Sequence, residues 1–168
     1  MQVALAVVGS IVAALLDTSV APFATIGGAR PDILLVSSLA VVVTIGSEAG
    51  FVWAFAGGLT LDMLSAPGRP IGSTVVALLV ATGMAAMIAR VAGRNHVVTA
   101  VAVTFPLTFL YQLVFGLLVA AALGGIPLSN PLGGALPVAI ENTVLAVPLA
   151  LAGRWSWRRW STQDRIEW

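Results

Sequence analysis

Long, continuously apolar runs separated by short segments are the feature that most constrains how this chain folds. A helix needs roughly 20 apolar residues to cross a bilayer, and most of these runs approach that length. Only 9% of the 168 residues are charged and the mean hydropathy is +1.02, whereas a soluble protein has about 25% charged residues. The runs lack the alternation of polar and apolar positions that a membrane β-barrel requires. We therefore expect an all-α polytopic membrane protein.

The apolar runs leave no room for a soluble domain. We predict a six-helix transmembrane bundle that forms a single integral membrane domain over residues 1–168. The second run is short, so that helix must borrow its flanks to cross; if it does not cross, the two termini lie on opposite sides. The predicted spans are 3–21, 31–47, 49–65, 71–89, 97–123 and 132–152, followed by a tail over 153–168.

The arginines predict the orientation. With six spans, one side of the membrane carries only Arg30 and Arg69, and the side that holds both termini carries the other six arginines. Cytoplasmic loops are the positively charged ones, so we predict that both termini and the tail are cytoplasmic. Tryptophan and arginine alternate from Arg154 to Trp160, a pattern typical of an anchor that contacts anionic membrane lipid rather than nucleic acid.

Two carboxylates lie about one turn from the predicted outer ends of their helices. Asp17 is best explained by an ion pair that fixes a helix end, with Arg30 on the same side. Asp62 follows the small pair Gly57 and Gly58, which permits close helix packing, and Arg69 lies nearby in sequence. For this patch a structural ion pair and a docking surface for a partner remain equal alternatives.

Glu141 and Asn142 form a predicted buried polar pair near the middle of the last span. A charge there costs at least about 2.5 kcal/mol, so the carboxyl must be neutral, paired or facing water. Gln112 on the preceding span is the candidate partner. A transport site and simple hydrogen bonding between helices are both consistent with the pair, and hydrogen bonding is favoured because one acid and one amide are too few for an ion site.

The sequence offers little for catalysis or metal binding. It has no cysteine, and its one histidine, His96, lies in a polar loop. No combination of nucleophile, base and orienting residue is evident, and Gly57-Gly58 lacks the Lys-Ser/Thr of a nucleotide-binding loop. We therefore predict a protein that is not an enzyme and has no metal site and no cofactor.

Over most of its length the chain resembles the bacterial rod shape-determining protein MreD family, and the best-matching region runs from Arg30 to Ser73. The resemblance lies in Arg30-Pro31-Asp32, in Leu61-Asp62-Met63-Leu64-Ser65 and in Pro70-Ile71-Gly72, with Ala66 where the family usually has glycine. Chain length, the number of spans and Asn142 ahead of Pro148 are also similar. The helix arrangement of this family resembles that of the substrate-binding subunits of energy-coupling-factor transporters.

The resemblance implies a non-enzymatic scaffold in the inner membrane that supports cell-wall elongation and rod shape. It also implies that the protein binds MreC and stabilises a complex with the actin-like filament protein and the peptidoglycan polymerase and transpeptidase. The alternative is a substrate-binding subunit of an energy-coupling-factor vitamin transporter, which would need a pocket lined by several polar groups. The scaffold hypothesis predicts that Gly58→Leu weakens partner binding without unfolding the bundle.

Overall fold

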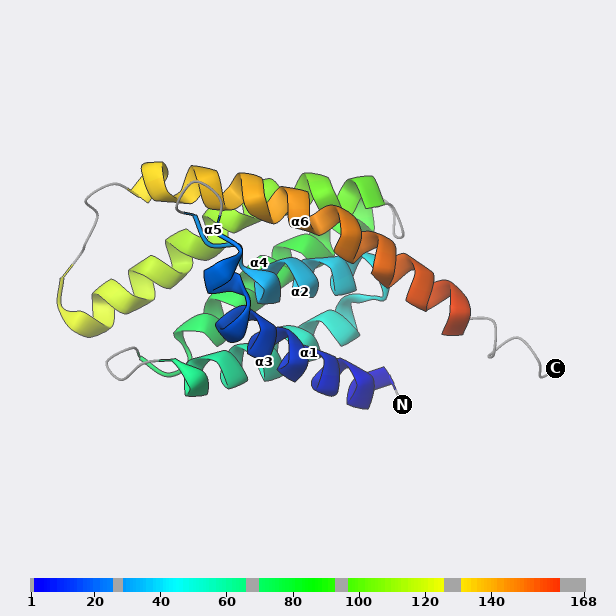
Figure 1. Cartoon of the computed structure of the whole chain (residues 1–168), viewed down its shortest axis with the longest axis horizontal. Helices are drawn as coiled ribbons and strands as arrows, with labels where there is room; N and C mark the ends of the chain where they lie inside the picture. The colour runs from blue at the N-terminus through cyan, green and yellow to red at the C-terminus, as the bar shows by residue number, and fades with distance from the viewer. Residues whose placement is uncertain (1, 26–28, 66–69, 93–96, 126–130, 161–168) are drawn as a thin grey trace.

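The protein is a bundle of helices in which one short helix lies in the middle and the longer helices surround it (Figure 1). The computed structural model describes residues 2–25, 29–65, 70–92, 97–125 and 131–160. Within these ranges the predicted six α-helices are confirmed. The elements are α1 (Gln2–Ser19), the 3-10 helix η1 (Ala21–Phe23), α2 (Ile33–Thr44), α3 (Ser47–Leu64), α4 (Ser73–Ala92), α5 (Val97–Leu123) and α6 (Pro131–Trp160).

Helix α2 is the centre of the bundle. It packs against every other α-helix, and around it α1, α3, α4, α5 and α6 follow one another as neighbours. Every residue from Leu34 to Thr44 is buried. At 12 residues it is about 18 Å long, shorter than the roughly 30 Å hydrocarbon core. Because other helices surround it, its ends need to reach polar protein groups rather than the membrane surface.

The α2 sequence is rich in β-branched residues, which are only moderate helix formers in water. In an apolar environment the backbone must satisfy its own hydrogen bonds, so a helix forms despite that preference. The helix ends at Ile45, and Gly46 then adopts φ 148°, a conformation that favours glycine. Gly46 thereby makes a tight connection to α3, which begins at Ser47.

Four helices are long and apolar enough to cross a membrane, judged by length and composition within the described residues. These segments are Val3–Phe23, Ser73–Ala92, Val97–Leu123 and Gly134–Trp155. The other two helices are α2, which is short, and α3, which has 18 residues but includes Glu48, Asp62 and several glycines. The fold is therefore that of a multi-pass membrane protein. Six complete crossings remain a prediction.

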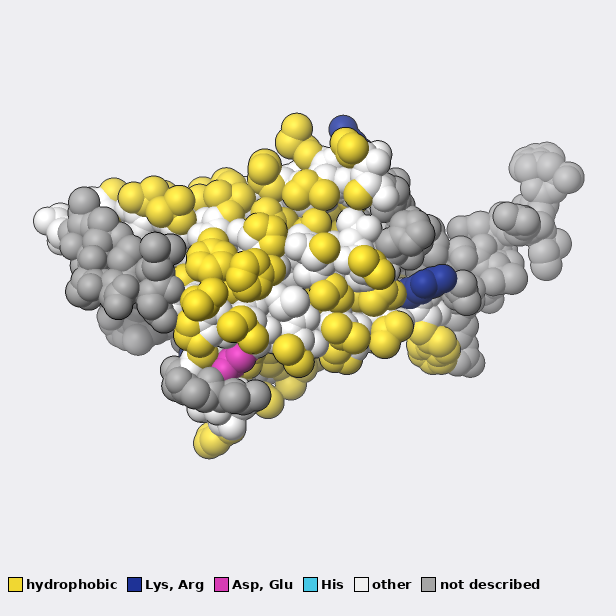
Figure 2. All heavy atoms as spheres, turned by 90° about the horizontal axis from the view of Figure 1, so that it is seen from above, with side chains coloured by type: hydrophobic (Ala, Val, Ile, Leu, Met, Phe, Trp, Pro, Cys, Tyr) yellow, Lys and Arg dark blue, Asp and Glu magenta, His cyan; other side chains and the backbone are white. Residues whose placement is uncertain are grey.

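Helix α1 begins and α6 ends at the same end of the bundle (Figure 1). Helix α6 runs on to Trp160, so the first part of the predicted tail is helical and extends past the bundle. Figure 2 shows that apolar side chains cover most of the middle of one face, with few charged atoms in view. An apolar belt of this kind suits a protein surrounded by lipid.

Candidate functional site

Gly57 and Gly58 face the interior of the bundle. A Cβ atom on Gly57 would lie 2.5 Å from Leu34 Cδ1, and one on Gly58 would lie 3.0 Å from the Cα of Val75. The two glycines thus allow α3 to approach α2 and α4 of the same chain closely. The expectation that Gly58→Leu spares the bundle conflicts with this geometry, because the α4 backbone occupies the space that a leucine needs.

Asp62 is buried and caps the start of α4. Its Oδ2 accepts a hydrogen bond from the backbone N–H of Gly72 at 2.8 Å, and its Oδ1 accepts one from Thr74 N–H at 3.3 Å. The first N–H groups of a helix have no partner within the helix, and a carboxylate also interacts favourably with the positive end of the helix dipole. These contacts support the structural alternative for Asp62. Arg69 lies outside the described residues.

Asn142 is fully buried and connects three segments. Its Oδ1 accepts a hydrogen bond from the backbone N–H of Asp32 at 2.8 Å, and its Nδ2 donates to Thr108 Oγ1 on α5 at 3.3 Å. The partner of Asn142 on α5 is therefore Thr108, and Gln112 lies one turn further along that helix. Glu141 is partly buried as a residue, and its Oε2 atom is buried, so the pairing of Glu141 with Asn142 stays a prediction.

Asp17 forms the predicted ion pair with Arg30. The guanidinium donates to the Asp17 backbone carbonyl and to its Oδ2, the latter at 3.2 Å. The Asp17 side chain is only 6% exposed, whereas that of Arg30 is 47% exposed. Asp17 Oδ1 also accepts a hydrogen bond from the backbone N–H of Ile33 at 2.7 Å. The pair therefore joins the end of α1 to the start of α2.

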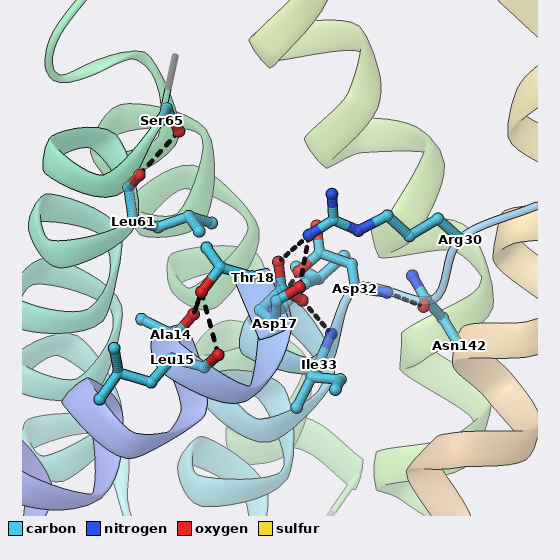
Figure 3. A network of polar contacts seen from close by, with 11 residues as sticks. Ala14, Leu15, Asp17, Thr18, Arg30, Asp32, Ile33, Leu61, Ser65 and Asn142 are labelled. Carbon is cyan, nitrogen blue, oxygen red and sulfur yellow. Dashed lines mark hydrogen bonds and ion pairs between the residues drawn. The ribbon is translucent and has the colours of Figure 1, made fainter. Parts of the chain in front are cut away.

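These contacts converge on the N-terminus of α2 (Figure 3). Asp32 caps the helix itself, since its Oδ1 accepts a hydrogen bond from Leu35 N–H at 2.8 Å, and the Tyr111 side chain also hydrogen-bonds the Asp32 carboxyl. Acceptors from α1 and α6 satisfy the N–H groups of Ile33 and Asp32. We call this set the polar cluster; it comprises Asp17, Arg30, Asp32, Thr108, Tyr111 and Asn142.

The polar cluster explains how a short helix starts in an apolar setting. An unsatisfied N–H group costs several kcal/mol in hydrocarbon, and side chains of α1, α6 and α2 itself meet these groups. Sequence reasoning used Asp32 only as part of a family motif. The signal for its role was available, because an aspartate directly before an apolar run is a typical N-cap.

An apolar groove lies on another part of the bundle. A groove of about 620 Å³ opens between α1, α3 and α4. Its walls are almost entirely hydrocarbon, and they include Val7 and Ile11 of α1, Phe51, Phe55 and Leu59 of α3, and Leu79 of α4. Among the described residues, no group of three or more His, Cys, Asp or Glu side chains could hold a metal ion.

A family model for the rod shape-determining protein MreD matches residues 1–152. The chain belongs to the MreD family. This family is a non-enzymatic membrane component of the shape-determining machinery, so membership implies a role in determining rod shape. Searches of curated proteins and of solved structures find no match. The resemblance of the helix arrangement to energy-coupling-factor subunits therefore remains a prediction.

Proposed function

We propose that this MreD family member is a membrane scaffold of the cell-wall elongation machinery. In this role it binds MreC and supports the complex of the actin-like filament protein with the peptidoglycan polymerase and transpeptidase. Both termini lie in the cytoplasm, and the chain crosses the inner membrane six times. The observation that carries the proposal is the family match, which covers all of the chain except the end of α6 and the residues after it.

The buried polar groups form hydrogen bonds within the protein, which supports a scaffold rather than a protein that binds a small molecule. The carboxylates of Asp17, Asp32 and Asp62 accept hydrogen bonds from helix N-termini, and Asn142 bridges two segments of the chain. A vitamin-binding subunit would need convergent polar groups that are available to the ligand. The groove between α1 and α3 is large enough for such a ligand, but its walls are hydrocarbon.

The orientation rests on the arginines. Arg90 lies in the last turn of α4, and Arg154 lies near the end of α6. Arg30 belongs to the polar cluster at the N-terminus of α2, which is the opposite end of the bundle. A basic end is retained in the cytoplasm during insertion. Reporter fusions at residue 25 and at the C-terminus would test this orientation, and equal reporter signals from the two sites would contradict it.

The experiment that tests the function is purification of the tagged full-length protein from its native host in mild detergent, followed by mass spectrometry. We expect MreC and enzymes of wall synthesis to co-purify in stoichiometric amounts. Recovery of a pair of transporter ATPases, or of a tightly bound vitamin, would overturn the proposal in favour of the transporter alternative. A tagged, unrelated multi-pass protein purified in parallel sets the background.

A further inference from the structure

The apolar groove is large enough to accommodate part of another helix. From Phe51 to Leu59 it follows α3 for about 12 Å, and the facing wall is one turn of α1 from Val7 to Ile11. Phe55 is 54% exposed although it projects from the middle of α3. The groove is therefore long enough to contact two turns of another helix.

The shape of this surface matters more than its polarity. Lipid tails are as apolar as leucine, so a membrane helix gains no hydrophobic energy by leaving lipid for a protein surface. Association depends instead on close packing of complementary shapes. The groove is bounded by the rings of Phe51 and Phe55, and its concave shape offers a helix more contact area than a flat surface would.

Glu48 lies on α3 one turn before Phe51, the first α3 residue that lines the groove. It lies in the first turn of α3 and is exposed. At 100° per residue, Glu48 lies on the same side of α3 as Phe51, Phe55 and Leu59. Within the described part of the chain the structure shows no ion pair for Glu48. It also lies at the end of the bundle where Arg90 and Arg154 are found, so within the described residues it places an acidic group at the same end as these two arginines.

We propose that the groove seats a membrane-spanning helix of a partner protein that carries a basic residue at its cytoplasmic end, next to Glu48. The inference rests on the proposed function, because Glu48 lies at the cytoplasmic end only in the orientation given above. Charge complementarity selects this occupant. A single-span protein retained by the positive-inside rule has Lys or Arg where its helix leaves the membrane on the cytoplasmic side, at the depth of Glu48.

The test is photo-crosslinking of the full-length protein in its native host. A photoreactive benzoyl-phenylalanine replaces Phe55 in one strain and Val144 in a control strain. Val144 is 68% exposed on α6 and lies eight residues before the predicted cytoplasmic end of its span at 152, and Phe55 lies six residues after the predicted cytoplasmic end of its span at 49. The two probes thus sample a similar depth on different sides of the bundle.

We expect the Phe55 probe to give at least fivefold more crosslinked product than the Val144 probe. Mass spectrometry should identify the product as a protein with a single apolar span flanked by Lys or Arg on the cytoplasmic side. A product that contains only lipid, or only a second copy of this chain, would overturn the proposal. So would an equal or greater yield from Val144.

A charge variant tests the role of Glu48. Glu48→Lys should lower the crosslink yield from the Phe55 probe at least threefold, and Arg90→Glu at the same end should change it less than twofold. Glu48 also interacts favourably with the positive end of the α3 dipole. If Glu48→Lys acted only by destabilising α3, it would lower the thermal stability of the protein without changing the crosslink yield per folded molecule. That result would overturn the electrostatic part of the proposal.

These outcomes are separable from failure of the proposed function. If MreC co-purifies with the unmodified protein but the Phe55 probe captures no single-span protein, the scaffold role stands and the groove is not its docking site. If no wall-synthesis protein co-purifies, the proposed function itself fails, whatever the groove contains.

Discussion

The two faces of α3 are built from the same apolar chemistry but serve different surroundings. One face carries Gly57, Gly58 and Asp62, all buried against α2 and α4. The other face carries Phe51 and Phe55, which are substantially exposed. A soluble protein would bury the phenylalanines and expose the carboxylate. In this chain, the two glycines and Asp62 face the bundle, and the two phenylalanines face outward.

The difference shows that polarity alone does not decide which residues of this helix face the bundle. Helices in a membrane gain energy from close approach, which glycine permits, and from hydrogen bonds that satisfy buried polar groups. Large apolar side chains on the outer face cost nothing in contact with lipid. The inner face should therefore be sensitive to added volume and lost acceptors, and the outer face should tolerate change. Four substitutions test this contrast.

The largest effect is expected for Gly58→Leu. The Cβ alone would lie 3.0 Å from the Cα of Val75, and the rest of the side chain must displace α4. Overpacking of this kind costs about 2–3 kcal/mol, and thermal unfolding in detergent should show a much lower midpoint. The control is Gly116→Leu on α5, where no atom lies within 4 Å of the added Cβ. Equal midpoints for the two variants would contradict the packing account.

A smaller loss is expected for Asp62→Ala, which removes the acceptor for Gly72 N–H and Thr74 N–H. Loss of a helix cap costs about 1–2 kcal/mol. Asp62→Asn keeps one carbonyl acceptor and should lose about half as much. Titration with a denaturing detergent measures both variants. If the asparagine variant were less stable than the alanine variant, a capping role would be excluded.

Trp53→Phe should cost about 1 kcal/mol, since the Trp53 Nε1–H donates to Ser37 Oγ of α2 at 3.0 Å. A double-mutant cycle with Ser37→Ala isolates this bond from changes in packing. We expect a coupling energy of about 0.5–1 kcal/mol. A coupling energy of zero would show that the hydrogen bond between α2 and α3 does not stabilise the fold.

The smallest effect is expected for Phe55→Leu on the outer face. Its side chain is more than half exposed, so the stability of the isolated protein should change by less than about 0.5 kcal/mol. Thermal unfolding in the same detergent provides the measurement. A loss as large as that of Gly58→Leu would show that the outer face is part of the core and would remove the contrast between the two faces.

The sequence predicts where the helices lie better than it predicts which residues of each helix point into the bundle. The apolar runs locate the helices, and the Asp17–Arg30 pair follows from proximity to two predicted helix ends. The inward orientation of Gly58 does not follow, because α3 has apolar residues on all sides and no polar stripe to mark a lipid face. Thr108 as the partner of Asn142 also depends on how α5 is rotated, which local sequence does not determine.

The start of α2 has a consequence for how the protein is made. The N–H of Asp32 finds its acceptor in Asn142, which is 110 residues further along the chain. During synthesis, the second helix therefore enters the membrane before the side chain that completes its first turn exists. The second helix can reach its final position only after the last helix has been inserted. Until α6 is in place, the backbone N–H of Asp32 lacks its acceptor, and this unsatisfied group marks an incomplete bundle for cellular quality control.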